Sequence, residues 1–290
     1  MAGKANHDYH ILEPDIWPLI GSISALTFTS GMVLSFHPDL FGAASSFVMW
    51  AGLAGLIATF FMWFKNIVIE AQRGDHTPVV QLHMRYGMIL FIASEVMFFV
   101  GWFWSFFDFA LFPTALEYDH VTGATTSLFG TEGAIAAFIP EGMEVLDPFA
   151  LPLLNTLILL CSGTTVTWAH HALIHGDRDG LKKGLWATIA LGVLFSAIQA
   201  YEYSVAPFGF GGNTYSSAFY MATGFHGFHV LIGTIFLAVC LVRAMRGGLT
   251  QQHHLGFEFA AWYWHFVDVV WLFLFASIYV WGSWGVALNH

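Results

Sequence analysis

The sequence predicts an all-α integral membrane protein with seven transmembrane helices, on three observations. Apolar residues make up 57% of the 290 residues and charged residues only 10%, too few to cover a soluble surface of this size. Seven apolar stretches each reach the ~20 residues that a helix needs to cross hydrocarbon. All nine Lys and Arg residues can be placed on one side of the membrane, which is typical of a protein whose helices cross the membrane several times.

We expect the spans at 16–36, 43–64, 86–111, 149–169, 185–206, 215–242 and 259–284. Lys4 precedes the first span, and the other cations lie in the second-to-third, fourth-to-fifth and sixth-to-seventh connections. Because basic loops stay inside, the N-terminus is expected in the cytoplasm or its topological equivalent, and the C-terminus outside. The chain forms one membrane domain, with a turn-rich inner connection at 65–85 and an acidic external loop at 112–148.

Charge and cysteine content exclude several classes of protein. Much of the net charge of −10 lies in the external loop, so it is no sign of a basic partner. No nucleic-acid partner is expected. Cys161 and Cys240 lie inside predicted spans, where thiols are usually inert packing residues, and no disulfide framework follows. The polar N-terminal segment lacks the features of a cleavable signal peptide, so the first span is expected to serve as the insertion signal.

Glu95 is the sharpest candidate for a functional group. It lies ten residues after Arg85, which places it about 15 Å into the third span, close to the membrane midplane. A carboxyl group at that depth is costly, so it indicates a functional site by default. One interpretation is a protonatable group that faces a cavity or a neighbouring helix. The other is a neutral carboxyl group that joins two helices by a hydrogen bond.

A second group of polar residues lies in the last two spans. His226 and His229 are three residues apart and share a helix face, as do His265 and Asp268. These four could build a haem or metal site, because His is the commonest metal ligand. We favour an interhelical cluster in which they satisfy one another by hydrogen bonds. Glu202 is expected within a turn or two of the outer surface, where solvation makes it a weak candidate.

The inner surface collects histidines and carboxylates, among them His7 and His10. Histidine titrates near neutral pH, so these residues could gather protons. Ordinary loop polarity explains the same composition, and both interpretations stay open.

Several long motifs resemble subunit III of the haem–copper (aa3-type) cytochrome c oxidases of proteobacteria and mitochondria, closest to the proteobacterial type. The matching stretches are His7–Leu19, Gly74–Gln81 (GDHTPVVQ), Arg85–Phe106 (RYGMILFIASEVMFFVGWFWSF), Leu151–His171, Gln199–Tyr203, Ala222–Val230 (ATGFHGFHV) and Gly256–Gly282. They are spread over all seven spans.

The resemblance implies a non-redox subunit of a proton-pumping cytochrome c oxidase in the bacterial inner membrane. It implies subunits I and II as partners, with haem a and copper in those subunits and none in this chain. Cytochrome c would donate electrons to the complex. The chain would pack on subunit I and support proton uptake and turnover stability. Phospholipids would fill a V-shaped cleft between the first two helices and the last five.

The resemblance also implies roles for individual residues. Glu95 matches the family's carbodiimide-reactive carboxyl group. Lys65, His76 and Arg243 match positions near lipid headgroups, although Ile69 stands where mitochondrial members carry a basic residue. We further hypothesise that His7 and His10 help to deliver protons toward subunit I.

Three alternatives are weighed against this. Subunit III of a quinol oxidase shares the fold but would belong to a complex that draws electrons from the membrane. A seven-helix receptor or retinal protein conflicts with the predicted orientation and with the absence of Lys from the last span. An independent haem enzyme would use His226 and His265 as ligands.

Overall fold

The computed structural model describes residues 9, 14–37, 42–112, 116–118, 125–127, 138–140, 142–211, 213–284 and 288–289. The chain divides into two compact units, Met1–Tyr86 and Gly87–His290. Among the described residues, seven helices are long and apolar enough to cross a membrane. The predicted fold class is confirmed.

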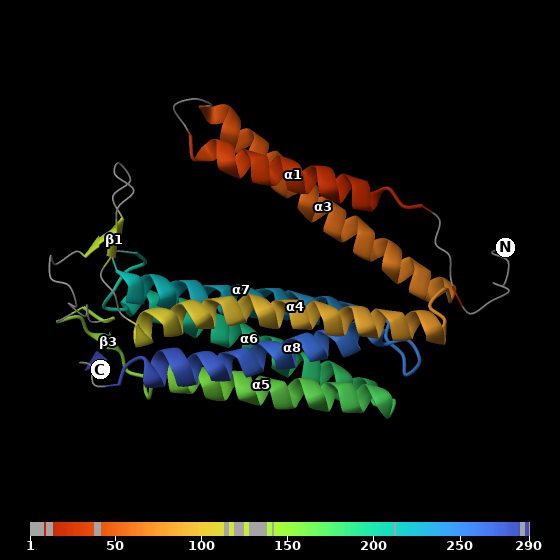
Figure 1. Ribbon diagram of the computed structural model, residues 1–290. Helices are drawn as coiled ribbons and strands as arrows, with labels where there is room; N and C mark the ends of the chain where they lie inside the picture. The colour runs from red at the N-terminus through yellow and green to blue at the C-terminus, as the bar shows by residue number, and fades with distance from the viewer. Residues whose placement is uncertain are drawn as a thin grey trace. The chain divides into compact units, whose positions relative to one another are not determined.

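The first unit is built on a pair of neighbouring helices, α1 (Trp17–Ser35) and α3 (Ala43–Arg73), which run side by side in Figure 1. Glycines bring the two backbones together. A Cβ on Gly31 would collide with the backbone of Met49, and a Cβ on Gly52 with that of Phe28. In a membrane no hydrophobic driving force brings helices together, because lipid tails are themselves apolar. Small residues favour association there because they let the two backbones approach closely.

The second unit contains five helices, and the first of them, α4 (Pro78–Leu111), begins within the first unit. The others are α5 (Leu151–Ile174), α6 (Arg178–Val205), α7 (Thr214–Met245) and α8 (Leu255–Leu274). The π-helix η1 (Phe275–Trp281) continues α8 without a break. Figure 1 shows these helices as a bundle of roughly parallel rods.

Trp264 organises the core of the second unit. Its side chain is completely buried, and it fits into space left by Gly192 on α6 and Gly233 on α7, where a Cβ would come within 2.7 and 2.9 Å of the ring. Its indole N–H donates to Ser162 Oγ on α5 at 2.8 Å. One tryptophan thus joins α8 to three neighbouring helices and satisfies its own polar atom.

Helix α4 packs differently, through large aromatic side chains. Phe98 and Trp102 meet Phe225 of α7 at ring-centroid distances of 5.0 and 5.2 Å. Phe99 meets Phe266 of α8 at 6.1 Å. Aromatic spacers of this size hold helices apart at the backbone while they fill the space between them.

The inner connections are shorter than the sequence predicts. The segment 65–85, expected to be a turn-rich loop, is helical except for residues 74–77. Gly74 ends α3 with a left-handed backbone (φ 86°), and Pro78 starts α4. Gly176 and Gly247 adopt the same backbone in the other two inner turns. The prediction was wrong because hydropathy detects only the membrane-spanning part of a helix.

Part of the acidic loop 112–148 forms short strands. Strand β1 (Leu116–Tyr118) pairs antiparallel with β2 (Thr125–Ser127). Strand β3 (Val145–Leu146) pairs in parallel with β4 (Leu288–Asn289) near the C-terminus. The division of the chain separates the first two membrane helices from the rest, as the resemblance implies. The predicted lipid cleft depends on how the two units are placed relative to each other, so it stays a prediction.

Candidate functional site

Glu95 on α4 pairs with His229 on α7. The distance from Glu95 Oε2 to His229 Nε2 is 2.8 Å. The His229 side chain is 9% exposed and that of Glu95 is 23% exposed. The structure therefore joins two residues that the sequence treats as separate candidates, and it gives Glu95 a partner on a neighbouring helix.

The hydrogen bonds of His229 determine how many protons this pair holds. His229 Nδ1 lies 2.6 Å from the carbonyl oxygen of Phe225, and a carbonyl oxygen only accepts, so Nδ1 carries a hydrogen. Nε2 is then either a bare acceptor or the second N–H of an imidazolium. In the first case Glu95 donates as a carboxylic acid, and in the second it accepts as a carboxylate. Either way one proton lies between the two groups.

Losing that proton would set a carboxylate oxygen against a nitrogen lone pair at 2.8 Å, which is repulsive. The contact and the shared proton therefore depend on each other. Aromatic rings surround the pair: the rings of Phe99 and Phe98 lie 4.9 and 5.9 Å from that of His229. Such a weakly polar environment strengthens the hydrogen bond.

The other three polar residues of the predicted cluster bond elsewhere. His226 is completely buried, and its Nε2 lies 3.0 Å from the carbonyl oxygen of Val267 on α8. His265 Nε2 lies 3.1 Å from Thr167 Oγ1 on α5. Asp268 Oδ1 is buried and has no hydrogen-bond partner among the described residues.

The prediction that these four residues form hydrogen bonds with one another is therefore wrong. Positions three apart on a helix point about 60° apart. That angle is enough to turn His226 toward α8 and His229 toward α4. Within the described part of the chain, no three His, Cys, Asp or Glu side chains lie so as to hold a metal ion.

Glu202 is a site that sequence reasoning underestimated. It was expected near the outer surface, yet it is completely buried. Tyr279 of η1 donates its hydroxyl hydrogen to Glu202 Oε1 at 2.6 Å, and the Gln199 amide donates to the same oxygen at 3.1 Å. The spacing of Gln199 and Glu202 on one face of an apolar span could have indicated a buried polar pair. The tyrosine partner, 77 residues away, could not have been predicted.

The predicted lipid-binding residues belong to different units. In the first unit, Lys65 is exposed on α3, and His76 Nε2 lies 3.8 Å from Glu70 Oε2. In the second unit, Arg243 is half-buried in the last turn of α7. A Cβ on Gly256 would lie 2.9 Å from Arg243 Nη1, so the guanidinium rests on the start of α8. His7 and His10 lie outside the described residues.

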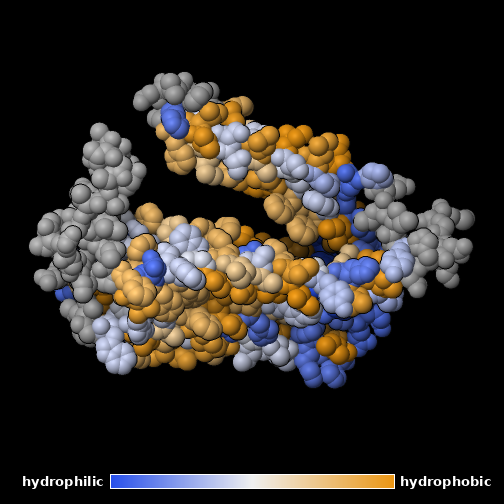
Figure 2. All heavy atoms as spheres, viewed as in Figure 1, coloured by the Kyte–Doolittle hydropathy of each residue, from blue (hydrophilic) through white to orange (hydrophobic). Residues whose placement is uncertain are grey.

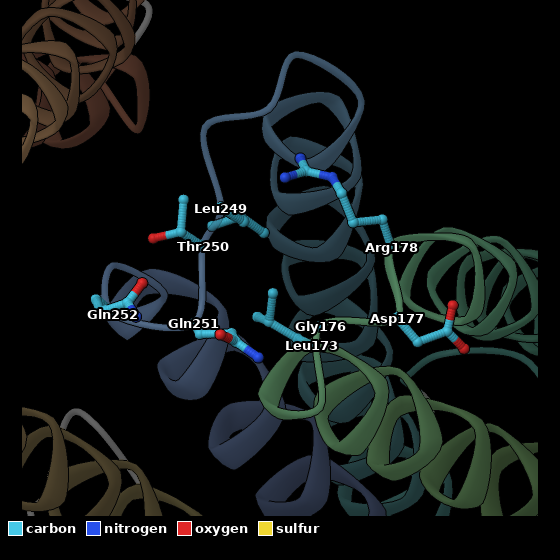
Figure 3. A pocket seen from close by; sticks show the side chains of 8 residues that line it. All are labelled: Leu173, Gly176, Asp177, Arg178, Leu249, Thr250, Gln251 and Gln252. Carbon is cyan, nitrogen blue, oxygen red and sulfur yellow. The ribbon is translucent and has the colours of Figure 1, made fainter.

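A hollow opens at one end of the second unit, between the α5–α6 turn and the α7–α8 connection (Figure 3). Gln251 crosses beside it and donates to the carbonyl oxygen of Ile174 at 2.9 Å. The Arg178 guanidinium lies 3.4 Å from the carbonyl oxygen of Ala244. Asp177 turns its carboxylate away (Figure 3) and caps α6 by accepting from the backbone N–H of Gly180 at 2.9 Å. These contacts fix the turns to each other.

Comparison with known proteins identifies the family. The family model described as cytochrome c oxidase subunit III matches residues 7–283. The chain is 50% identical to cytochrome c oxidase subunit 3 of Cyprinus carpio over 284 residues, which cover 98% of this chain and 100% of that protein. The protein of the same name from Xenopus laevis is 49% identical over the same coverage. That from Dugong dugon is 48% identical over 96% of this chain and 98% of its own length.

These relatives favour a cytochrome c oxidase over the quinol oxidase alternative, since their names state the former. They are vertebrate proteins, so they do not support the proteobacterial subtype that the motifs suggested. A match over nearly the whole length, on a structure with seven membrane helices, leaves one assignment: the chain belongs to the cytochrome c oxidase subunit III family.

Proposed function

We propose that this chain is a non-redox subunit of cytochrome c oxidase that packs on subunit I, holds phospholipids, and supports proton uptake and turnover stability. The observation that carries the proposal is the family match over residues 7–283, with relatives aligned over their whole length. Haem a and copper would reside in subunits I and II, and cytochrome c would deliver electrons to the complex rather than to this chain.

Purification through an affinity tag on this chain tests the proposal. In mild detergent the tagged chain should co-elute with polypeptides of the masses of subunits I and II and with haem a absorbance. The washed material should oxidise reduced cytochrome c. Elution of the chain alone, or with its own haem absorbance after separation from the other polypeptides, would contradict the proposal.

The Glu95–His229 pair gives the chain a proton-holding group inside the membrane. The resemblance assigns Glu95 a reactive carboxyl group. The 2.8 Å contact with His229 fits two forms of Glu95: a carboxylic acid, which is the form that carbodiimides attack, and a carboxylate beside an imidazolium. Labelling of the complex with a lipid-soluble carbodiimide should modify wild-type Glu95 and spare Glu95→Gln. Unchanged labelling, turnover lifetime and lipid content in Glu95→Gln would remove the proposed role.

Lipid binding is proposed for Lys65 and His76 of the first unit and for Arg243 of the second. Each lies at or near the end of a helix that carries basic residues, and cations there attract anionic headgroups. Mass spectrometry of lipids retained by Lys65→Gln and Arg243→Gln complexes tests this, with Lys183→Gln, at an exposed position in α6, as the control. The two lipid-site variants should lose tightly held phospholipid, whereas the control should retain it.

Proton collection by His7 and His10 is a further proposal. Its support is the composition of the inner surface, where histidines that titrate near neutral pH gather. Replacement of both residues by Ala should slow steady-state turnover above neutral pH and leave it unchanged at lower pH, where protons are abundant. Identical pH–rate profiles for the variant and the wild type would contradict it.

We assign the chain to a bacterial inner membrane, with a cytoplasmic N-terminus and a periplasmic C-terminus. The support is the one-sided distribution of Lys and Arg and the presence of Ile69 where mitochondrial members carry a basic residue. Fusion of a reporter enzyme that is active only in the periplasm should give activity at the C-terminus and none at the N-terminus.

A further inference from the structure

The seam between α5 and α8 exposes polar groups at the depth of the membrane centre. His265 and Asp268 lie near the middle of the span Leu255–Trp281, and Gly163 and Thr164 near the middle of Leu151–Ile174. The side chains of Thr164, Thr167 and His265 are exposed. In Figure 2 hydrophilic residues interrupt the hydrophobic surface over the middle of these two helices. We call this surface the α5–α8 seam.

The α7 face of the same unit is apolar at this depth. The exposed side chains along the middle of α7 are all hydrophobic: Phe228, Leu231, Ile232, Ile235 and Val239. Such a face suits lipid, which offers no hydrogen bonds. The α5–α8 seam departs from that pattern, and polar groups in hydrocarbon are expensive unless another protein group satisfies them.

Hydrogen-bond directions show what the seam lacks. Thr167 donates its only hydroxyl hydrogen to the carbonyl oxygen of Gly163 at 2.9 Å. It must therefore accept from His265 Nε2 at 3.1 Å, so Nε2 carries the hydrogen and Nδ1 of the neutral ring offers a lone pair. The seam thus presents an acceptor that has no donor among the described residues.

Asp268 adds a second acceptor at the same place. Its side chain is nine-tenths buried, with the residue only 8% exposed, and its Oδ1 has no hydrogen-bond partner among the described residues. A methyl group on Gly163 would lie 2.8 Å from Asp268 Oδ2 and 3.7 Å from His265 Nδ1. The absence of a side chain at Gly163 therefore leaves the carboxyl group and the imidazole side by side beneath the exposed surface.

We propose that the α5–α8 seam is the docking surface for a transmembrane helix of a neighbouring oxidase subunit, which brings an N–H or O–H donor to His265 and Asp268. The inference rests on the proposed function and adds the face of the chain that meets the partner. A helix is the occupant that fits, because it carries its own backbone hydrogen bonds through the membrane and can place one polar side chain at mid-depth. The exposed Leu160 and Leu157 beside the seam give that helix an apolar contact.

Site-specific photo-crosslinking in native membranes tests the inference. A benzoylphenylalanine at Thr164 should form an adduct with another subunit of the haem-containing complex, and the same group at the lipid-facing Ile235 should not. Thr164 suits the probe because its hydroxyl bonds only to the carbonyl oxygen of Cys161 on its own helix. An adduct confined to lipid, to this chain or to a second copy of it would overturn the inference.

Bulky substitutions supply an independent measurement. Thr164→Trp should still insert into the membrane, yet the share of chain that stays with the complex in detergent should fall by about tenfold, equivalent to ~1.4 kcal/mol, within the range for overpacked contacts. Ile235→Trp should stay bound at the wild-type level. If wild-type chain co-elutes with haem a and Thr164→Trp does so equally, the seam is not the docking surface, while the proposed function stands. If wild-type chain elutes alone, the proposed function fails first.

Discussion

At the scale of residues, several polar groups inside the membrane are partnered across helices, among them Glu95 and Glu202, and the partners decide what they can do. Glu95 faces His229, whose other ring nitrogen is committed to a backbone carbonyl. One proton therefore belongs to the pair. Glu202, in contrast, accepts two hydrogen bonds and is sealed from solvent, so its role is to fix η1 against α6.

We expect Glu95→Gln and Glu95→Ala to differ. The glutamine amide can donate to His229 Nε2 and preserve the contact, whereas alanine leaves a polar nitrogen unpaired at a cost of about 1–3 kcal/mol. Thermal unfolding of the purified complex, followed by loss of this subunit, measures the difference. Glu144→Ala, at an exposed carboxyl group, is the control. Equal unfolding temperatures for the two Glu95 variants would contradict the paired geometry.

Tyr279→Phe tests the second buried carboxyl group. Removal of the hydroxyl group takes away the 2.6 Å hydrogen bond to Glu202 and should destabilise the second unit by about 1–3 kcal/mol. Tyr201→Phe, at a residue that is 59% exposed, should change the stability little. The midpoint of unfolding in a denaturing detergent series checks both variants, and a Tyr279→Phe midpoint equal to the wild type would be inconsistent with the contact.

At the scale of elements, glycines determine which helices approach closely. The α1–α3 pair depends on them, because a side chain at Gly31 or Gly52 would enter the backbone of the facing helix. Helix α4 instead uses aromatic spacers toward α7 and α8. Two modes of packing thus coexist in one chain, and each follows from the size of the residues at the contact.

Gly52→Leu should therefore separate α1 from α3. Overpacking of such a contact costs about 1–3 kcal/mol, and here the obstruction is backbone that cannot rotate away. Gly101→Leu is the matched control, since an added Cβ there meets no atom within 4 Å. Limited proteolysis of membranes should reveal faster cleavage near the α1–α3 connection in Gly52→Leu alone. Equal protection in the two variants would count against close backbone contact.

At the scale of the whole molecule, the basic residues at helix ends and the membrane spans together predict one orientation. Figure 2 shows hydrophilic residues gathered at the end of the second unit that carries the inner turns, while hydrophobic residues cover its sides. That division of the surface is what a membrane imposes on a bundle of long helices.

Cysteine labelling tests this orientation. In a chain whose Cys161 and Cys240 are replaced by Ala, Gly209→Cys between α6 and α7 should react with a membrane-impermeant maleimide added to intact cells. Gln252→Cys, between α7 and α8, should react only after the membrane is opened. Both positions suit the probe, because Gln252 is exposed and a Cβ on Gly209 meets no atom within 4 Å. The reverse pattern would invert the topology.

The sequence by itself determined the fold class, the number of spans and the family, because each depends on long stretches of composition and motif. It located all seven helices and singled out Glu95 and His229. It missed the helical character of most of 65–85, since hydropathy does not follow a helix past the hydrocarbon. Only the tertiary structure decided that Glu95 meets His229, that Glu202 is buried against Tyr279, and that His265 and Asp268 lie together at the seam between α5 and α8. Those outcomes depend on how each helix is rotated against its neighbours, and rotation is fixed by contacts between residues far apart in the chain.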